Sequence, residues 1–559
     1  MRRRLHRAGI GVCAVLLAAI LAGCQVGIPR SGTVYPGQGV DPETEESLIF
    51  NPARPVPGAS QEDIVIGFIA AASSATSDYA IAREFLAPGL STTWNPHAGV
   101  VIDSGQRPVT PEGDSVRMTL NAVASVDEHG TMRAAGMGGA IQLHFELQRV
   151  LGEWRISVAE DGIVLDEDMF PSVFNEHSLY FLAPQSRVLV PDQRWFLRGA
   201  TTATRIVTEL LEGPSVLLRE GVTTTAFPEG TVLAASSVPV VSGLAQVDLS
   251  PEALTAETPA LRMMLAQIET SLSRVAGVTR ASLSVDQSVL LSGPADPSWA
   301  ERYPRVPSKP IVVSDGTFGE LGTQRITPFG KLSNIVVDAS ARGITVSRDQ
   351  ATVVYVTPEG VFFATNTAAT LADSRPGLID PTLDGYGFVW SVPHGQPRAL
   401  RVKNQAGVTA VPPAPWLDAV SIEKLRISRD GTRLVALYDR GDDYVLAVSG
   451  VIRGAGGIPT AFTEPVELAV FTERPVDVDW IDESQIALAT SSSGSASVEV
   501  LSVGGRSENL GPASSIESIA GGNSISQLRV LDSDGVLREY RGSSWQEVAV
   551  DITALAKRG

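Results

Sequence analysis

The sequence is poor in cysteine, with two in 559 residues. Cys13 lies within an apolar N-terminal run, and Cys24 lies just after that run. If the segment before Cys24 is removed, one thiol remains in the mature chain. Such a chain cannot form an internal disulfide, and it has no cysteine to spare for a zinc site or for thiol catalysis. Its domains must therefore be stabilised by the burial of apolar side chains.

Motifs of common enzymes are also missing. The sequence has no Gly-x-Ser-x-Gly elbow and no Gly-x-x-x-x-Gly-Lys-Ser/Thr phosphate loop. The histidines after Cys24 do not stand at a zinc-binding spacing such as His-Glu-x-x-His; they are His97, His129, His144, His177 and His394. Asp532, Asp534 and Gly535 resemble the start of a calcium loop but lack its later ligands, which favours a β-turn. We therefore expect no catalytic residue, metal or cofactor, and we predict that the protein is not an enzyme.

Positive charge is in deficit. The chain has 44 Lys and Arg against 62 Asp and Glu, a net charge of −18. Because Lys and Arg dominate the binding of phosphate, this balance argues against a nucleic-acid partner and against folded domains that lie flat on an anionic membrane. The content of 43% hydrophobic residues is that of an ordinary folded protein. The length suggests about three or four domains.

Long apolar runs are absent beyond the N-terminus, where residues 8–21 are too short to span a bilayer comfortably. Four arginines precede this run, which predicts a signal peptide over residues 1–23. Leu21, Ala22, Gly23 and Cys24 resemble the bacterial lipobox. The resemblance implies that Cys24 carries N-palmitoyl and S-diacylglycerol groups. Since each buried methylene contributes about 0.8 kcal/mol, the acyl chains would hold the protein at the outer face of the cell membrane. An uncleaved N-terminal anchor is the alternative.

Residues 24–59 join the lipidated N-terminus to a stretch rich in proline, glycine and acidic residues. This composition is typical of a linker, which would span roughly 30–35 Å as a flexible coil. The alternative is that part of it packs as an arm on the next domain, where the apolar triplet Leu48-Ile49-Phe50 would dock.

Residues 60–175 predict an α+β domain. Ser60 and Asp63 have the spacing of a capping box at the start of a helix, and apolar residues at helical spacing follow. Alternating apolar residues over 116–120 and 141–147 then predict antiparallel strands.

Helices followed by such a meander resemble the NTF2-like cone fold. Cones of this type can enclose a pocket. Trp94, His97 and Trp154 are candidates to line it, and the alternative is that they are core and loop residues.

Residues 176–292 carry a series of more specific motifs. In chain order they are Tyr180-Phe181, Leu211-Glu212-Gly213-Pro214, Pro228-Glu229-Gly230-Thr231, Val247-Asp248-Leu249-Ser250 and Ala266-Gln267-Ile268. Their order and spacing resemble the Germane (GerMN) domain of sporulation and germination proteins. The resemblance implies a small, non-catalytic α+β module. The residues themselves fit a structural role, because glycine and proline stand where elements end. We interpret Asp248 as structural rather than catalytic.

Residues 293–310 are rich in proline and predict a second linker. Residues 311–559 predict an all-β domain, in which a strand that ends in Ser-Arg-Asp or a similar triplet recurs at 344–349, 425–431 and 476–482. Repeats about 35–52 residues long, with about four strands each, are typical of propeller blades. We expect a β-propeller of five or six blades; an irregular sandwich is the alternative.

A lipobox, a Germane domain and a C-terminal propeller in this order resemble the LpqB family of actinobacterial envelope lipoproteins. The resemblance spans the mature chain. It implies association with the extracytoplasmic domain of a sensor histidine kinase, MtrB, whose response regulator MtrA governs cell-wall and division genes. We therefore expect a membrane-anchored, protein-binding accessory that modulates this two-component system. The sequence alone assigns no ligand-binding or interface residue.

Two other functions are open at this point. A ligand sensor would bind a cell-wall fragment or a lipid in the N-terminal domain or in the propeller mouth. A cell-wall glycan hydrolase would use a pair of the abundant carboxylates in the propeller mouth, and we consider it the less favoured of the two.

Overall fold

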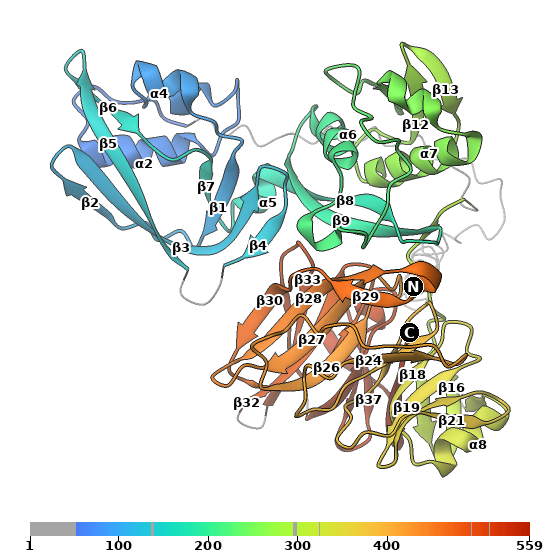
Figure 1. Ribbon diagram of the computed structural model, residues 1–559. Helices are drawn as coiled ribbons and strands as arrows, with labels where there is room; N and C mark the ends of the chain where they lie inside the picture. Colours follow the sequence, from blue (N-terminus) through green and yellow to red (C-terminus); the bar gives the residue numbers. More distant parts are fainter. Residues whose placement is uncertain (1–51, 136–138, 295–298, 324, 493–494, 514) are drawn as a thin grey trace, which may run out of the picture. The chain divides into compact units, whose positions relative to one another are not determined.

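The computed structural model describes residues 52–135, 139–294, 299–323, 325–492, 495–513 and 515–559 (Figure 1). The predicted signal peptide, the lipobox with Cys24 and the apolar triplet at residues 48–50 lie outside these ranges. Within them, no helix is long and apolar enough to cross a membrane. The chain is multidomain as predicted: two α+β domains precede an all-β propeller.

The first domain consists of short helices and a mainly antiparallel sheet (blue and cyan in Figure 1). Its helices are α2 (Gln61–Ala71), α3 (Ala80–Arg83), α4 (Pro88–Thr93) and α5 (Phe170–Val173). Its strands are β1 (Gly99–Asp103), β2 (Val109–Glu112), β3 (Ser115–Asp127), β4 (Met132–Ala134), β5 (Ala140–Val150), β6 (Glu153–Val158) and β7 (Ile163–Asp166). The sheet order is β6-β5-β3-β1-β7, with β2 and β4 also paired to β3. Strands β1 and β7 are parallel.

Local sequence signals account for the elements of this domain. The Asp63 N–H donates to the Ser60 hydroxyl at 3.1 Å, and the Ser60 N–H donates to the Asp63 carboxylate at 3.1 Å, which confirms the capping box. The alternating side chains of Val116, Met118 and Leu120 are all buried in the core. The alternation therefore predicted correctly which face of β3 is internal.

Residues 52–59, at the end of the predicted linker, contact the first domain. The Gly58 N–H donates to the Glu153 carboxylate at 2.8 Å. Arg54 pairs with Glu84. Residues 52–59 therefore lie against the first domain, while the triplet that the arm interpretation would dock lies outside the described residues.

The second domain consists of a hairpin, a small sheet and two α-helices (green in Figure 1). The helices are α6 (Thr202–Glu212) and α7 (Thr258–Leu272), with 3-10 turns at Val216–Leu218 and Pro251–Thr255. The strands are β8 (Phe174–Leu182), β9 (Val188–Leu197), β10 (Val240–Val241), β11 (Leu244–Leu249), β12 (Arg280–Val285) and β13 (Ser288–Ser292). Strands β10 to β13 form one sheet in chain order, and β8 and β9 form an antiparallel hairpin.

The motifs of this domain lie where its elements end or pack. Helix α6 ends at Glu212 because Gly213 has a φ of +106°, a region that favours glycine. Helix α7 buries Met264, Ile268 and Leu272 in the domain core. The predicted amphipathic face is thus the one that packs on the hairpin and the sheet.

The third domain is almost entirely β (yellow to red in Figure 1), with one short α-helix, α8 (Lys331–Asp338), and 3-10 turns at Ala455–Gly457 and Ile525–Gln527 among its described residues. Its first strands are β15 (Ile311–Ser314), β16 (Thr317–Leu321) and β17 (Ile326–Pro328). These strands are antiparallel neighbours in the order β17-β16-β15. On its other side, β15 pairs antiparallel with the distant strand β39 (Ile552–Arg558). Strand β39 also pairs in parallel with β18 (Arg342–Val346).

The strands that follow β18 first extend the sheet of β39 and then form antiparallel sheets of four strands each, except for one sheet of five. After β18 come β19 (Val353–Thr357), β20 (Gly360–Ala364), β21 (Ala369–Asp373), β22 (Thr382–Leu383), β23 (Phe388–Ser391), β24 (Arg401–Asn404), β25 (Thr409–Ala410), β26 (Ser421–Ile427), β27 (Arg433–Asp439), β28 (Tyr444–Arg453), β29 (Pro459–Phe462), β30 (Val466–Phe471), β31 (Arg474–Trp480), β32 (Gln485–Ser492), β33 (Ser495–Ser502), β34 (Glu508–Ala513), β35 (Ile516–Ala520), β36 (Arg529–Asp532), β37 (Leu537–Arg541) and β38 (Ser544–Ala549). The blade number, five or six, stays a prediction.

The second and third domains share a hydrophobic core. Val190 and Leu218 pack in one buried cluster with Val435, Leu446 and Val478 of the propeller. Such a shared core resists independent motion of the two domains, because separation would expose apolar surface to water.

Polar contacts reinforce this junction. The Tyr180 hydroxyl donates to the Glu483 carboxylate at 2.8 Å, and Arg302 pairs with the same carboxylate at 2.7 Å. The Trp195 indole N–H donates to the carbonyl of Gly504 at 2.9 Å. The hairpin of the second domain is therefore fixed to the loops of the third.

The proline-rich connection 293–310 is bound to both of its neighbours where it is described. Strand β14 (Glu301–Arg302) pairs in parallel with β9. Further along, Val306 exchanges two hydrogen bonds with Asn523, at 3.0 and 2.9 Å. The connection thus adds to the contacts between the domains.

Candidate binding sites

The three residues predicted to line a pocket in the first domain separate in the structure. Trp94 is a core residue, 2% exposed, and packs edge-on against Phe68 with ring centroids 5.1 Å apart. Trp154 is half-buried beneath the guanidinium of Arg149, 4.4 Å from the ring centre. His97 lies at a cavity. Trp94 is therefore a core residue, as in the alternative interpretation, whereas Trp154 is a strand residue of β6 that packs against the edge of the core.

The cavity at His97 lies between the first and second domains. Its volume is about 380 Å³, and strand β9 and the start of α6 contribute part of its wall. Tyr79 is at the cavity and packs edge-on to His97, with ring centroids 5.6 Å apart. Burial raises the pKa of the Tyr79 hydroxyl well above its ordinary value, and the Asp78 carboxylate adds to that shift, so the group stays neutral.

A larger cavity, of about 880 Å³, lies where propeller turns meet the β8–β9 hairpin. Successive turns of the propeller contribute to its wall, and each carries an aspartate at its start: Asp349, Asp384 and Asp430. Their carboxylates accept hydrogen bonds within their own turns, from Ala351 N–H at 3.0 Å in the first and from Thr432 N–H at 2.9 Å in the third. These carboxylates are therefore structural groups of the turns.

Buried ion pairs hold two of these turns in place. Asp384 accepts from Arg453 at 2.8 Å, and neither side chain is more than 1% exposed. Asp430 accepts from Arg433 at 2.5 Å. Burial alone would raise the pKa of Asp430, but the nearby Arg433 charge and the hydroxyl donors of its turn hold that pKa below its ordinary value.

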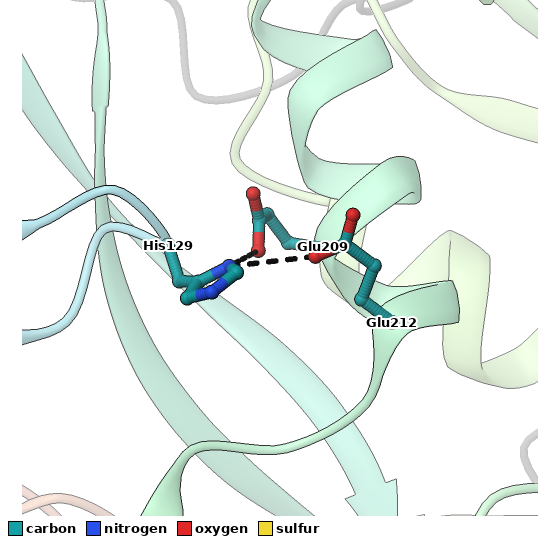
Figure 2. A group of neighbouring side chains, drawn as sticks. All are labelled: His129, Glu209 and Glu212. Atoms are coloured by element: carbon teal, nitrogen blue, oxygen red, sulfur yellow. Dashed lines mark hydrogen bonds and ion pairs between the residues drawn. The ribbon is translucent and has the colours of Figure 1, made fainter. Parts of the chain in front are cut away.

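A third feature joins the first two domains: His129, Glu209 and Glu212 lie together at the end of α6 (Figure 2). The His129 Nδ1 atom is 3.0 Å from an oxygen of Glu209 and 3.4 Å from an oxygen of Glu212. Burial raises the pKa of Glu209, and Arg205 and His129 oppose that shift. The carboxylate of Glu209 also pairs with Arg205 at 2.9 Å.

Sequence reasoning missed this cluster. His129 and Glu209 are 80 residues apart, so no spacing motif connects them. The available signal was the spacing of Glu209 and Glu212, which puts two carboxylates on one side of a helix end.

Two acidic residues considered from the sequence have structural roles. The Asp532 carboxylate accepts from the N–H groups of Asp534 and Val536, at 3.1 and 2.8 Å, which confirms a β-turn there. Asp248 accepts from the Ser284 hydroxyl at 2.7 Å, between the paired strands β11 and β12.

Comparison with known families accounts for most of the chain. Residues 54–171 match the family described as "Lipoprotein LpqB, N-terminal domain". Residues 178–290 match "Sporulation and spore germination", the Germane domain. Residues 320–554 match "Lipoprotein LpqB beta-propeller domain".

Individual proteins give the same correspondence. Lipoprotein LpqB of Rhodococcus opacus is 25% identical and covers 89% of this chain and 88% of its own length. Lipoprotein LpqB of Cutibacterium acnes is 23% identical and covers 97% of this chain and 98% of its own length. Among solved structures, the first GerMN domain of GerM from Bacillus subtilis is similar over 22% of this chain and 93% of its own length, with 18% identity and a TM-score of 0.18.

Proposed function

Because the chain belongs to the LpqB family of lipoproteins, we propose that it is a membrane-anchored, extracytoplasmic accessory of a sensor histidine kinase of the MtrB type. In this proposal Cys24 carries the lipid, and the folded domains bind the extracytoplasmic part of the kinase. Binding then modulates two-component signalling in cell-wall and division homeostasis. The kinase as partner follows from the family resemblance.

The observation that carries a binding role is the shared core of the second and third domains. Val190 and Leu218 pack with propeller strands, and Glu483 bonds to both Tyr180 and Arg302. A junction of this kind presents a preorganised surface, so little conformational entropy is lost when a partner binds. Lipid anchoring supports the same role, because confinement to the plane of the kinase raises the effective concentration of a weak contact.

Site-specific photo-crosslinking in native membranes tests the proposal. Crosslinkable residues replace exposed side chains of the full chain: Val411 and Leu417 on the propeller, and Val240 and Val289 on the second domain. We expect at least one of these faces to capture the sensor kinase. Capture of no kinase at any position contradicts the proposal.

The predicted anchor is tested separately with Cys24→Ala. The variant protein should fold as before but lose its effect on phosphorylation of the response regulator, because its concentration near the kinase falls. Normal signalling from an unanchored form would show that the lipid is not needed for regulation.

A second candidate function is sensing of an envelope ligand, favoured by the cavity of about 880 Å³ between the propeller turns and the hairpin. Its volume lies within the usual range of ligand pockets, about 300–1,000 Å³. Thermal shift of the full chain with soluble cell-wall fragments is the measurement. A rise in melting temperature that Tyr386→Ala, at the cavity wall, abolishes would support this function.

A further inference from the structure

Side chains from two domains converge at the C-terminal end of helix α6 (Figure 2). His129 comes from the turn between β3 and β4 of the first domain. Glu209 and Glu212 come from the last turn of α6 in the second. We propose that these three residues bind a divalent transition-metal ion of the zinc class. The proposal does not depend on the accessory function.

The spacing of the candidate ligand atoms suits a metal ion. The imidazole Nδ1 of His129 is 3.0 Å from an oxygen of Glu209 and 3.4 Å from an oxygen of Glu212, and all three atoms lie within 4.8 Å of one another. Around a zinc ion with ligands at about 2.0–2.2 Å, neighbouring ligand atoms are about 3–3.5 Å apart. One imidazole and two carboxylates form a ligand set that zinc accepts, with further positions left for water.

Charge at the site also favours a cation. Helix α6 ends in two glutamates and has no basic residue in its last turn. This placement opposes the helix dipole, whose C-terminal end is negative and prefers positive charge. A bound divalent cation would compensate both carboxylates and the dipole.

Arginines near Glu209 leave the proposed ligand atoms available. Arg205 pairs with the other oxygen of Glu209, at 2.9 Å. Arg194 approaches the ligand oxygen only to 3.9 Å, and its closest carboxylate partner is Asp192, at 2.8 Å. Further carboxylates, those of Asp127 and Glu128, lie in the same turn as His129. The surroundings therefore stay net negative.

The turn that carries His129 is held rigidly on the second domain. The Arg194 guanidinium donates to the carbonyl of His129 at 2.8 Å, and the backbone N–H of Trp195 donates to the carbonyl of Gly130 at 2.8 Å. Arg205 donates to the carbonyl of Glu128 at 2.8 Å. Rigid placement of a ligand from each domain lowers the entropy cost of metal binding.

Glu128 can orient the imidazole. Its carboxylate is 3.8 Å from Nε2 of His129, the nitrogen that faces away from the two glutamates of α6. Closure of this short gap by an exposed side chain would place the proton on Nε2 and leave Nδ1 free to bind a metal. Carboxylate–histidine–metal arrangements of this type are common in zinc sites.

Zinc titration of the metal-free full chain in detergent, followed by calorimetry, tests the proposal. His129→Asn and Glu212→Gln are suitable variants, because these side chains are 43% and 52% exposed and their loss leaves the buried Glu209 in place. The matched control is His394→Asn, which removes an exposed histidine that pairs with a single carboxylate, Glu423, at 2.9 Å. Circular dichroism without metal checks that each variant folds.

We expect one zinc ion per wild-type chain, and affinity at least about tenfold weaker in both site variants but unchanged in the control. Cobalt should bind in the same place, with absorption bands that both site variants abolish. No binding by the wild type overturns the proposal. So does binding that is unchanged in the folded site variants, or weakened equally by His394→Asn, because the trio is then only a hydrogen-bonded contact between domains.

Discussion

The buried ion pair between Asp384 and Arg453 predicts a large loss of stability when its charge is removed. Asp384 also accepts from the Trp390 indole N–H at 3.0 Å. Asp384→Asn keeps the size of the side chain but leaves the Arg453 charge buried without a counter-ion. Loss of one partner of such a pair costs about 3–5 kcal/mol. For a domain of about 250 residues that corresponds to a fall in melting temperature of about 6–20 °C.

The control for this prediction is the exposed pair of Glu301 and Arg348, whose side chains are 43% and 48% exposed. Glu301→Gln should cost no more than about 1 kcal/mol. Both variants are compared as full chains in detergent, by pulse proteolysis across a urea series with a C-terminal tag as readout. If Asp384→Asn lowers the stability no more than Glu301→Gln, burial does not determine the contribution of these pairs, and the reasoning is refuted.

Two further predictions concern the junction and the acid side of the pH profile. Glu483→Gln should increase hydrogen exchange in the β8–β9 hairpin, because the hydrogen bond to Tyr180 weakens and the pair with Arg302 is lost; an unchanged exchange rate would contradict a coupling role. The pKa of Asp430 in the folded protein lies below its ordinary value of 3.8. The stability that the ionised Asp430 contributes is therefore fully present above pH 3.8 and is lost as the pH falls through the folded-state pKa. Urea unfolding from pH 6 downward should therefore show a steeper loss in the wild type than in Asp430→Asn, and parallel curves would rule this out.

Local structure could be predicted from the sequence where neighbouring residues decide it. Ser60 with Asp63 specified a helix start, and Gly213 specified a helix end, because caps depend on residues a few positions apart. Alternation along β3 specified the buried face for the same reason. The domain order followed from motifs of this local kind.

Contacts between distant segments could not be predicted in this way. Tyr180 and Glu483 are 303 residues apart, and His129 and Glu209 are 80 apart. No periodicity or motif links such positions, because their meeting depends on how whole domains pack. Trp94 shows the same limit: as an aromatic residue after a short helix it fitted a pocket wall as well as a core, and only the packing of Phe68 against it decides.

The pairing of β39 with both β15 and β18 has a consequence during synthesis. A ribosome produces β15 first and β39 after every other described strand of the domain. Until β39 is complete, two strands have unpaired edges that can join other chains. A stop codon shortly before residue 552 would therefore release a polypeptide that has nearly all of its strands yet is prone to aggregate. Premature termination at this late point should harm the cell's supply of the protein almost as much as loss of the whole domain.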